Sequence, residues 1–77
     1  MTPEELLNLP KDTRVWVSDD GKLWLRRYLD HCERSIVDKD VICAVVYPMG
    51  CDSWTAQNYK GKGMDPRMTT WILWRLA

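Results

Sequence analysis

The most constraining feature of this sequence is the uncharged run Val41–Tyr47 in the middle of the chain. Most of its residues are β-branched, and together with the shortness of the run they favour a strand over a helix. A strand that is apolar on both faces has to be covered on both faces. A chain of 77 residues buries only about 60% of the surface that its unfolded form exposes. Covering this strand therefore limits what the rest of the chain can form.

The N-terminal residues carry the signals of a helix start. Thr2 can cap the first turn, and Pro3 suits the first helical position. Glu5 stands three residues after Thr2, as in a capping box. Pro10 restricts the residue before it to extended backbone and so ends the element. We predict one short helix over about residues 3–9.

The other apolar segments alternate with polar residues and are separated by turn residues, a pattern typical of antiparallel strands. Asp20 and Gly21, between two of these segments, favour a tight hairpin. We predict strands over residues 13–17, 22–29, 41–47, 53–56 and 68–76, with loops over 30–39 and 57–67. The predicted fold class is mainly β. Residues 1–77 form one domain, a small curled antiparallel sheet or SH3-like partly open barrel of about five strands with one short N-terminal helix.

Two segments resemble a known group of proteins. The segment Val15–Trp24, with its Val-Ser-Asp-Asp-Gly turn, and the final segment Trp71–Ala77 are similar to small accessory proteins encoded by bacteriophages. Those proteins open with such a hairpin and close on a Trp-containing strand. The resemblance covers about a quarter of the chain and does not extend to the predicted loops, so no functional residue is carried over. It implies a phage or prophage source and a short, non-enzymatic protein that acts by binding.

The nucleophilic and metal-ligating residues do not form a recognisable site. Cys32, Cys43 and Cys51 lack the spacing of any common zinc site, and His31 would point away from its neighbour Cys32 on a strand. We interpret the cysteines as buried, reduced thiols. The aspartates stand beside predicted turns, where Asp is favoured for backbone reasons. The sequence shows no nucleophile, base and orienter that belong together, so we predict no enzyme activity, no metal and no cofactor.

Segment 58–67 is the best candidate for a ligand site within the sequence. Its glycines would let backbone N–H groups approach a phosphate, and its basic side chains supply charge. Aromatic side chains in and near the segment would stack a base. The candidate ligand-binding residues are Trp54, Asn58, Tyr59, Lys60, Lys62 and Arg67. The alternative interpretation is a solvated hairpin loop with no ligand.

The tryptophans indicate a second kind of surface. The chain has five Trp and no Phe, and its predicted strands hold more apolar faces than a small sheet and a two-turn helix can cover. Trp16, Trp71 and Trp74 are therefore interface candidates. A homo-oligomer, most simply a symmetric dimer, would cover them. The competing interpretation is a curled barrel whose two faces are both satisfied internally.

Charge and hydropathy narrow the function classes. The formal net charge is zero, which argues against a general nucleic-acid coat protein. No apolar run approaches membrane-spanning length, and the polar, acidic N-terminus leads us to expect no signal peptide, no membrane partner and a cytoplasmic location, in the host cell for a phage product. Our leading hypothesis is non-enzymatic protein binding, to itself and to a host protein, as an anti-defence inhibitor. The alternative is a nucleotide- or nucleic-acid-binding module built on segment 58–67.

Overall fold

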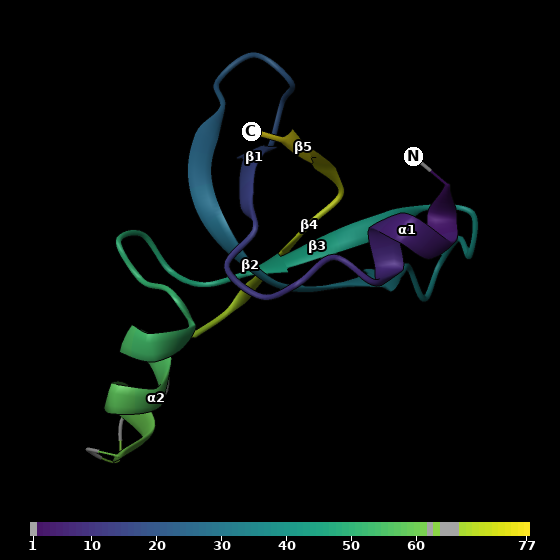
Figure 1. The fold of residues 1–77 in the computed structure, drawn as a ribbon. Coiled ribbons are helices and arrows are strands. Elements are labelled where there is room, and N and C mark those ends of the chain that lie inside the picture. The colour runs from purple at the N-terminus through teal and green to yellow at the C-terminus, as the bar shows by residue number, and fades with distance from the viewer. Residues whose placement is uncertain (1, 62, 64–66) are drawn as a thin grey trace.

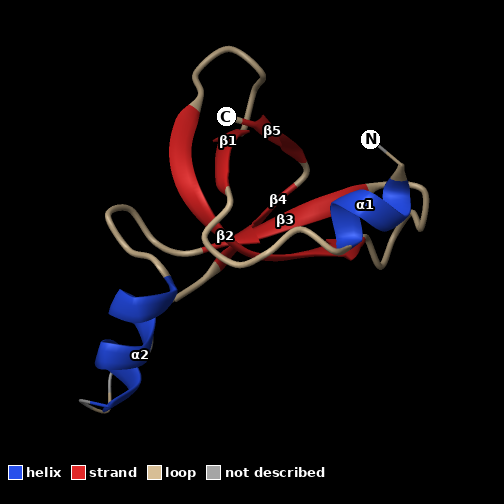
Figure 2. Cartoon of the chain, in the orientation of Figure 1, coloured by secondary structure: helices blue, strands red, loops and turns tan. Residues whose placement is uncertain are grey.

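A computed structural model describes residues 2–61, 63 and 67–77 of the chain, except for the side chains of residues 59–61. Within these residues, five antiparallel strands form one sheet that two short helices accompany (Figure 1, Figure 2). In chain order the elements are α1 Pro3–Leu7, β1 Arg14–Ser18, β2 Leu25–Arg34, β3 Ile42–Val46, α2 Ser53–Gly61, β4 Thr69–Trp71 and β5 Leu73–Leu76. The strand order is β4-β3-β2-β1-β5. The prediction of a mainly β fold, with a curled, partly open sheet and a short N-terminal helix, is confirmed.

The two edge strands of the sheet follow one another along the chain, so the sheet has to curl to bring its two edges together. β4 pairs with β3 at one edge, β5 pairs with β1 at the other, and a single residue, Ile72, separates β4 from β5. The indole N–H of Trp74 on β5 donates to the carbonyl of Ile42 on β3 at 2.8 Å, which ties the two halves together. The prediction of one strand over 68–76 is wrong, because a straight strand could not pair with both β3 and β1.

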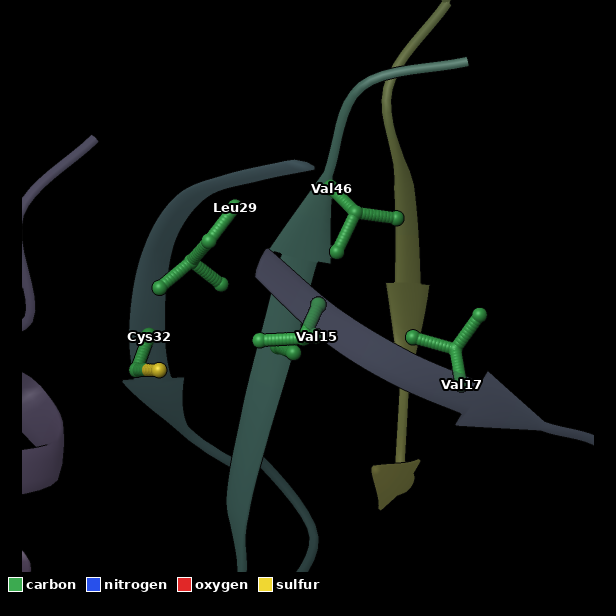
Figure 3. Packing of buried hydrophobic residues seen from close by; sticks show 6 residues of the cluster. Val15, Val17, Leu29, Cys32 and Val46 are labelled. Atoms are coloured by element: carbon green, nitrogen blue, oxygen red, sulfur yellow. The ribbon is translucent and has the colours of Figure 1, made fainter. Parts of the chain in front are cut away.

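The core lies on the inner face of this curl. Val15 and Val17 of β1, Leu29 of β2 and Val46 of β3 are completely buried. Figure 3 shows these side chains and that of Cys32 gathered between the strands. Burying an aliphatic side chain of this size contributes about 1.5–3 kcal/mol, so this cluster supplies the main apolar stabilisation of the sheet.

Strand β3 is buried on both faces, as the run Val41–Tyr47 predicts. Ala44 and Val46 face the inner core and are completely buried. On the other face, Cys43 and Val45 are only 4% and 7% exposed. The neighbouring strands β2 and β4 flank β3 on its two sides. The low exposed fractions on both faces show that β3 is covered within the chain itself.

The turn that precedes β2 is wider than predicted. The carboxylate of Asp20 accepts the backbone N–H groups of Lys22 at 2.8 Å and Leu23 at 3.1 Å. These bonds hold the two residues in the turn, as Asp side chains do in Asx turns. The second strand therefore starts at Leu25 and not at residue 22.

The same strand also ends later than predicted. β2 continues to Arg34, so the prediction of a loop over 30–39 is wrong for its first half. A β-bulge between Leu29 and His31 shifts the register against β3. The extra residue lets Leu29 and Cys32 both face the core although they are three positions apart.

Helix α2 replaces the strand predicted over 53–56. The carboxylate of Asp52 accepts the backbone N–H of Thr55 at 2.9 Å and its hydroxyl at 3.0 Å. Asp12, which is 41 positions away, accepts the backbone N–H of Ser53 at 2.8 Å and its hydroxyl at 2.5 Å. These bonds satisfy N–H groups that the start of a helix leaves without an intrahelical partner. They outweigh the strand preference of the Trp and Thr residues in this segment.

Helix α1 begins as predicted and is shorter than the predicted range 3–9. The Thr2 hydroxyl oxygen caps it by accepting the backbone N–H of Glu5 at 3.2 Å. Leu7 and Leu9 pack against the inner core. The helix therefore covers one end of the sheet, beside β2 and β3 (Figure 1).

Candidate protein-binding surface

An apolar groove of ≈ 550 Å³ opens between α1, the start of β3 and β5. It is lined by Pro3, Leu6, Asp40, Ile42, Ile72, Trp74, Arg75 and Leu76. Ile72 and Leu76 are 65% and 42% exposed. The groove exists because the sheet is not closed. Trp74 and Leu76 pair with Val17 and Val15 and so share their inner face, and the five-residue helix α1 is too short to cover them.

Beside the groove, the hairpin between β2 and β3 ends in two apolar side chains. Ile36 is 100% exposed and Val37 is 96% exposed. Hydrogen bonds fix this tip, since the Ser35 hydroxyl accepts the N–H of Val37 at 3.3 Å and the Asp38 carboxylate accepts the N–H of Asp40 at 3.0 Å. Because Asp40 also lines the groove, the tip adjoins the groove. Figure 1 shows the turn between β2 and β3 beside α1. We call the groove residues together with Ile36 and Val37 the groove surface.

The three Trp interface candidates are divided between the core and the surface. Trp71 and Trp74 are partly buried and both pack against the inner core, because the chain turns its corner between them. Trp74 also lines the groove. Trp16 lies on the other face of β1, where the guanidinium carbon of Arg26 is 5.3 Å from its ring centroid. Of the three, Trp74 belongs to the groove surface, and contact of any of them with a partner stays a prediction.

The ligand candidates near segment 58–67 lie on and after α2. Trp54 is 70% exposed on this helix, Asn58 is exposed near its end, and Arg67 is exposed beyond it. The side chains of Tyr59 and Lys60 and the whole of Lys62 lie outside the described residues. The prediction of a loop over 57–67 is wrong as far as Gly61, where α2 ends. Ligand binding by these residues stays a prediction.

A polar cluster surrounds the bulge of β2. The Tyr47 hydroxyl donates to the Asp30 carboxylate at 2.5 Å, and the Lys11 ammonium lies 3.7 Å from the same oxygen. The Nδ1 atom of His31 lies 2.6 Å from the other oxygen. Partial burial acts to raise the pKa of Asp30, but the hydrogen bonds from Tyr47 and His31 and the charges of His31 and Lys11 lower it overall. The same hydrogen bond raises the pKa of His31, with Glu33 adding to the effect. The cluster therefore holds an ionised Asp30 that joins β2 to the end of β3.

The cysteine side chains are buried, and the Ser53 hydroxyl is used in a hydrogen bond. Cys32, Cys43 and Cys51 are all buried, in agreement with their interpretation as buried thiols. Burial, with a smaller contribution from Cys43, raises the pKa of Cys32 to about 11, so this thiol is protonated at neutral pH. The Ser53 hydroxyl donates to Asp12 at the start of α2. Among residues 2–61, 63 and 67–77, no group of three or more His, Cys, Asp or Glu could hold a metal ion.

The tip of the groove surface was not predicted from the sequence, where Ile36 and Val37 fall within the loop predicted over 30–39. A signal was available, because two β-branched apolar residues stand between Ser35 and Asp38, whose side chains favour turns. A turn that brackets two apolar residues places them in solvent or against a partner.

No protein-family model, curated protein or solved structure matches this chain. In the part of the chain that the structure describes, neither helix has the length and apolar character needed to cross a membrane.

Proposed function

We propose that this chain acts by non-enzymatic protein binding and that the groove surface is the contact. The observation that carries the proposal is the apolar tip beside an apolar groove. Ile36 and Val37 are almost fully exposed, and Ile72 and Leu76 expose 65% and 42% of their surface next to the groove. Soluble monomers rarely gather large apolar side chains in this way outside binding sites.

The partner that the groove surface fits most directly is a second copy of the chain. In a two-fold dimer the same surface serves both subunits, so a protrusion and a recess have to lie side by side. The tip with Ile36 and Val37 is the protrusion, and the groove lined by Ile72 and Trp74 is the recess. A specific interface buries about 800 Å² on each partner.

The resemblance of segments Val15–Trp24 and Trp71–Ala77 to phage accessory proteins supports a further part of the proposal. In the host cytoplasm the chain would bind a host protein and inhibit it, with a defence protein as the target class. We place that contact at the same groove surface, in competition with the second copy. Binding of this kind needs no cofactor.

Light scattering after size exclusion tests self-association. We expect the wild-type chain to exceed its monomer mass of 9.1 kDa in the micromolar range. The double variant Val37→Asp, Ile72→Asp should be monomeric, because it places charge on both the tip and the groove. The matched control is Met49→Asp, since Met49 is 77% exposed but follows the opposite end of β3. At dilutions where the wild type is monomeric, all three proteins should have similar melting temperatures, because each exposed substitution changes stability by no more than about 0.5 kcal/mol.

A wild-type chain of 9.1 kDa at every concentration would exclude the second copy as partner. A photo-crosslinking residue at position 72, with expression in the host, tests the host protein separately. We expect one crosslinked host protein whose yield falls with Val37→Asp and is unchanged with Met49→Asp. Equal yields from the two variants would contradict a contact at the groove surface.

A further inference from the structure

The face of β2, β1 and β5 that points away from the core carries alternating arginine and aromatic side chains. Trp16 on β1 lies directly opposite Arg26 on β2 and Arg75 on β5. Residues at paired positions of antiparallel strands share one face of the sheet. Arg14 lies two positions before Trp16 and therefore belongs to the same face. Because Val15 lies on the core side, this arrangement forms the outer face of the sheet.

Two of the arginines lie over the tryptophan rings. The guanidinium carbon of Arg26 is 5.3 Å from the ring centroid of Trp16, and that of Arg75 is 4.3 Å from the centroid of Trp24. The indole N–H of Trp24 also donates to the carbonyl of Gly21 at 3.2 Å, which fixes the ring in the turn before β2. Both rings are partly exposed. The outer face thus holds two ordered aromatic rings, each beside a cation.

The charge of this face is not neutralised locally. Arg14, Arg26 and Arg75 are exposed, and no carboxylate of the described residues lies within 4.0 Å of any of them. The carboxylate of Asp20, in the adjoining turn, instead accepts backbone N–H groups. A chain with zero net charge therefore presents one face on which cations and rings gather. We call Arg14, Trp16, Trp24, Arg26 and Arg75 the Arg–Trp face; of these residues, Arg75 also lines the groove.

We propose that the Arg–Trp face binds single-stranded nucleic acid, a function beyond protein binding at the groove surface. Guanidinium groups donate paired hydrogen bonds to phosphate oxygens, and exposed rings stack unpaired bases. A base that displaces the Arg26 guanidinium from the Trp16 ring leaves this cation free for the adjacent phosphate. Duplexes hide their base faces, and an acidic peptide would use the arginines without the rings. The combination of both groups therefore selects a single strand.

Fluorescence anisotropy with labelled oligo-dT and oligo-U of about 15 nucleotides, near the upper site size of one OB fold, tests this proposal. We expect binding in the micromolar range at low salt. For three phosphate contacts the logarithm of the affinity should fall against the logarithm of salt with a slope of about −2. The double variant Arg26→Gln, Arg75→Gln should bind at least about tenfold more weakly, with a slope near −0.7.

The matched control is Arg27→Gln. Arg27 is adjacent in sequence but pairs with Val15, and so lies on the other face of the sheet. It should leave both affinity and slope unchanged. The stacking contribution is tested by Trp16→Leu and Trp24→Leu, each of which should weaken binding about fivefold or more. Melting curves confirm that each variant is folded.

Two outcomes would overturn the proposal. One is no anisotropy change for either oligonucleotide with the wild-type protein at low salt. The other is that polyglutamate competes as well as unlabelled oligo-dT while both Trp→Leu variants bind normally. That second result would assign the Arg–Trp face to an acidic protein partner.

Discussion

The sheet core and helix α2 are stabilised by different interactions. In the sheet, Val15, Leu29 and Val46 come from three strands and are completely buried against one another. In α2, Ala56 is the one buried residue among the side chains that the structure describes. The helix starts instead on the carboxylates of Asp12 and Asp52.

This difference shows how two kinds of interaction specify structure. Apolar burial is not directional and follows the alternation of residue types along a strand. Capping is directional and depends on single oxygen atoms in particular positions. Helix α2 has nine residues, and isolated helices shorter than about 12–15 residues are marginal in water. We therefore expect the sheet to unfold as a unit and α2 to be lost separately.

The largest effect should come from Leu29→Ala. Removing a completely buried leucine side chain leaves a cavity and costs about 2–5 kcal/mol. That is a large part of the stability of a chain of 77 residues, about 4–12 kcal/mol. We expect the urea midpoint of the sheet to fall, with α2 lost no later than the sheet, because α2 needs the folded sheet.

The control for this variant is Leu23→Ala, because Leu23 is 70% exposed in the turn before β2. It should change the free energy of unfolding by less than about 0.5 kcal/mol. Equal losses in the two variants would contradict a core centred on Leu29.

A smaller and local effect should follow from Asp12→Asn. Asp12 has a φ of 68°, a left-handed conformation that Asn tolerates, so the backbone should be retained. The variant loses the charge that receives both hydrogen bonds from Ser53. We expect a loss of about 1 kcal/mol, typical of a helix cap, confined to α2.

Amide hydrogen exchange rates in α2 and β3 test this prediction. The amides of α2 should exchange about fivefold faster in Asp12→Asn, while those of β3 keep the wild-type rate. Asp38→Asn is the matched control, since its carboxylate accepts an N–H in the β2–β3 turn and does not contact α2. Faster exchange in β3 as well would mean that α2 and the sheet unfold as one unit.

The same contrast explains what could be predicted from the sequence. β1 and β3 were predictable because their alternation and β-branched residues act locally. α2 was not, because one of its two capping carboxylates, Asp12, stands 41 positions away. The bulge after Leu29 and the corner at Ile72 depend on which strands pair. Strand pairing involves residues far apart in the sequence, so the residues of one segment do not predict it.

The candidate binding surfaces were predictable from the sequence only in part, because each is formed by segments that are far apart in the chain. The sequence predicted surplus apolar faces and named Trp74, which lines the groove. It did not reveal the groove, because the groove forms where α1 and β5 fail to close the sheet. The Arg–Trp face was missed because Arg26 and Arg75 come together with Trp16 only through strand register.

The smallest effect concerns charge, and it tests how far the sheet depends on burial alone. The hydrogen bond to Asp30 raises the pKa of His31 above its usual 6.5. A raised pKa in the folded chain adds stability that is complete below pH 6.5 and is lost as the pH rises through the folded-state pKa. The His31 side chain is 47% exposed, so solvent screening should keep this contribution within about 1 kcal/mol.

Urea unfolding at pH 6 and pH 8 should show a slightly lower stability at pH 8. His31→Gln, which cannot ionise, should remove the difference, while Asp30, whose pKa is lowered, stays ionised at both pH values. An identical pH dependence in wild type and His31→Gln would assign the effect to other groups. A loss much larger than 1 kcal/mol would show that the sheet relies on this charge pair as well as on its buried core.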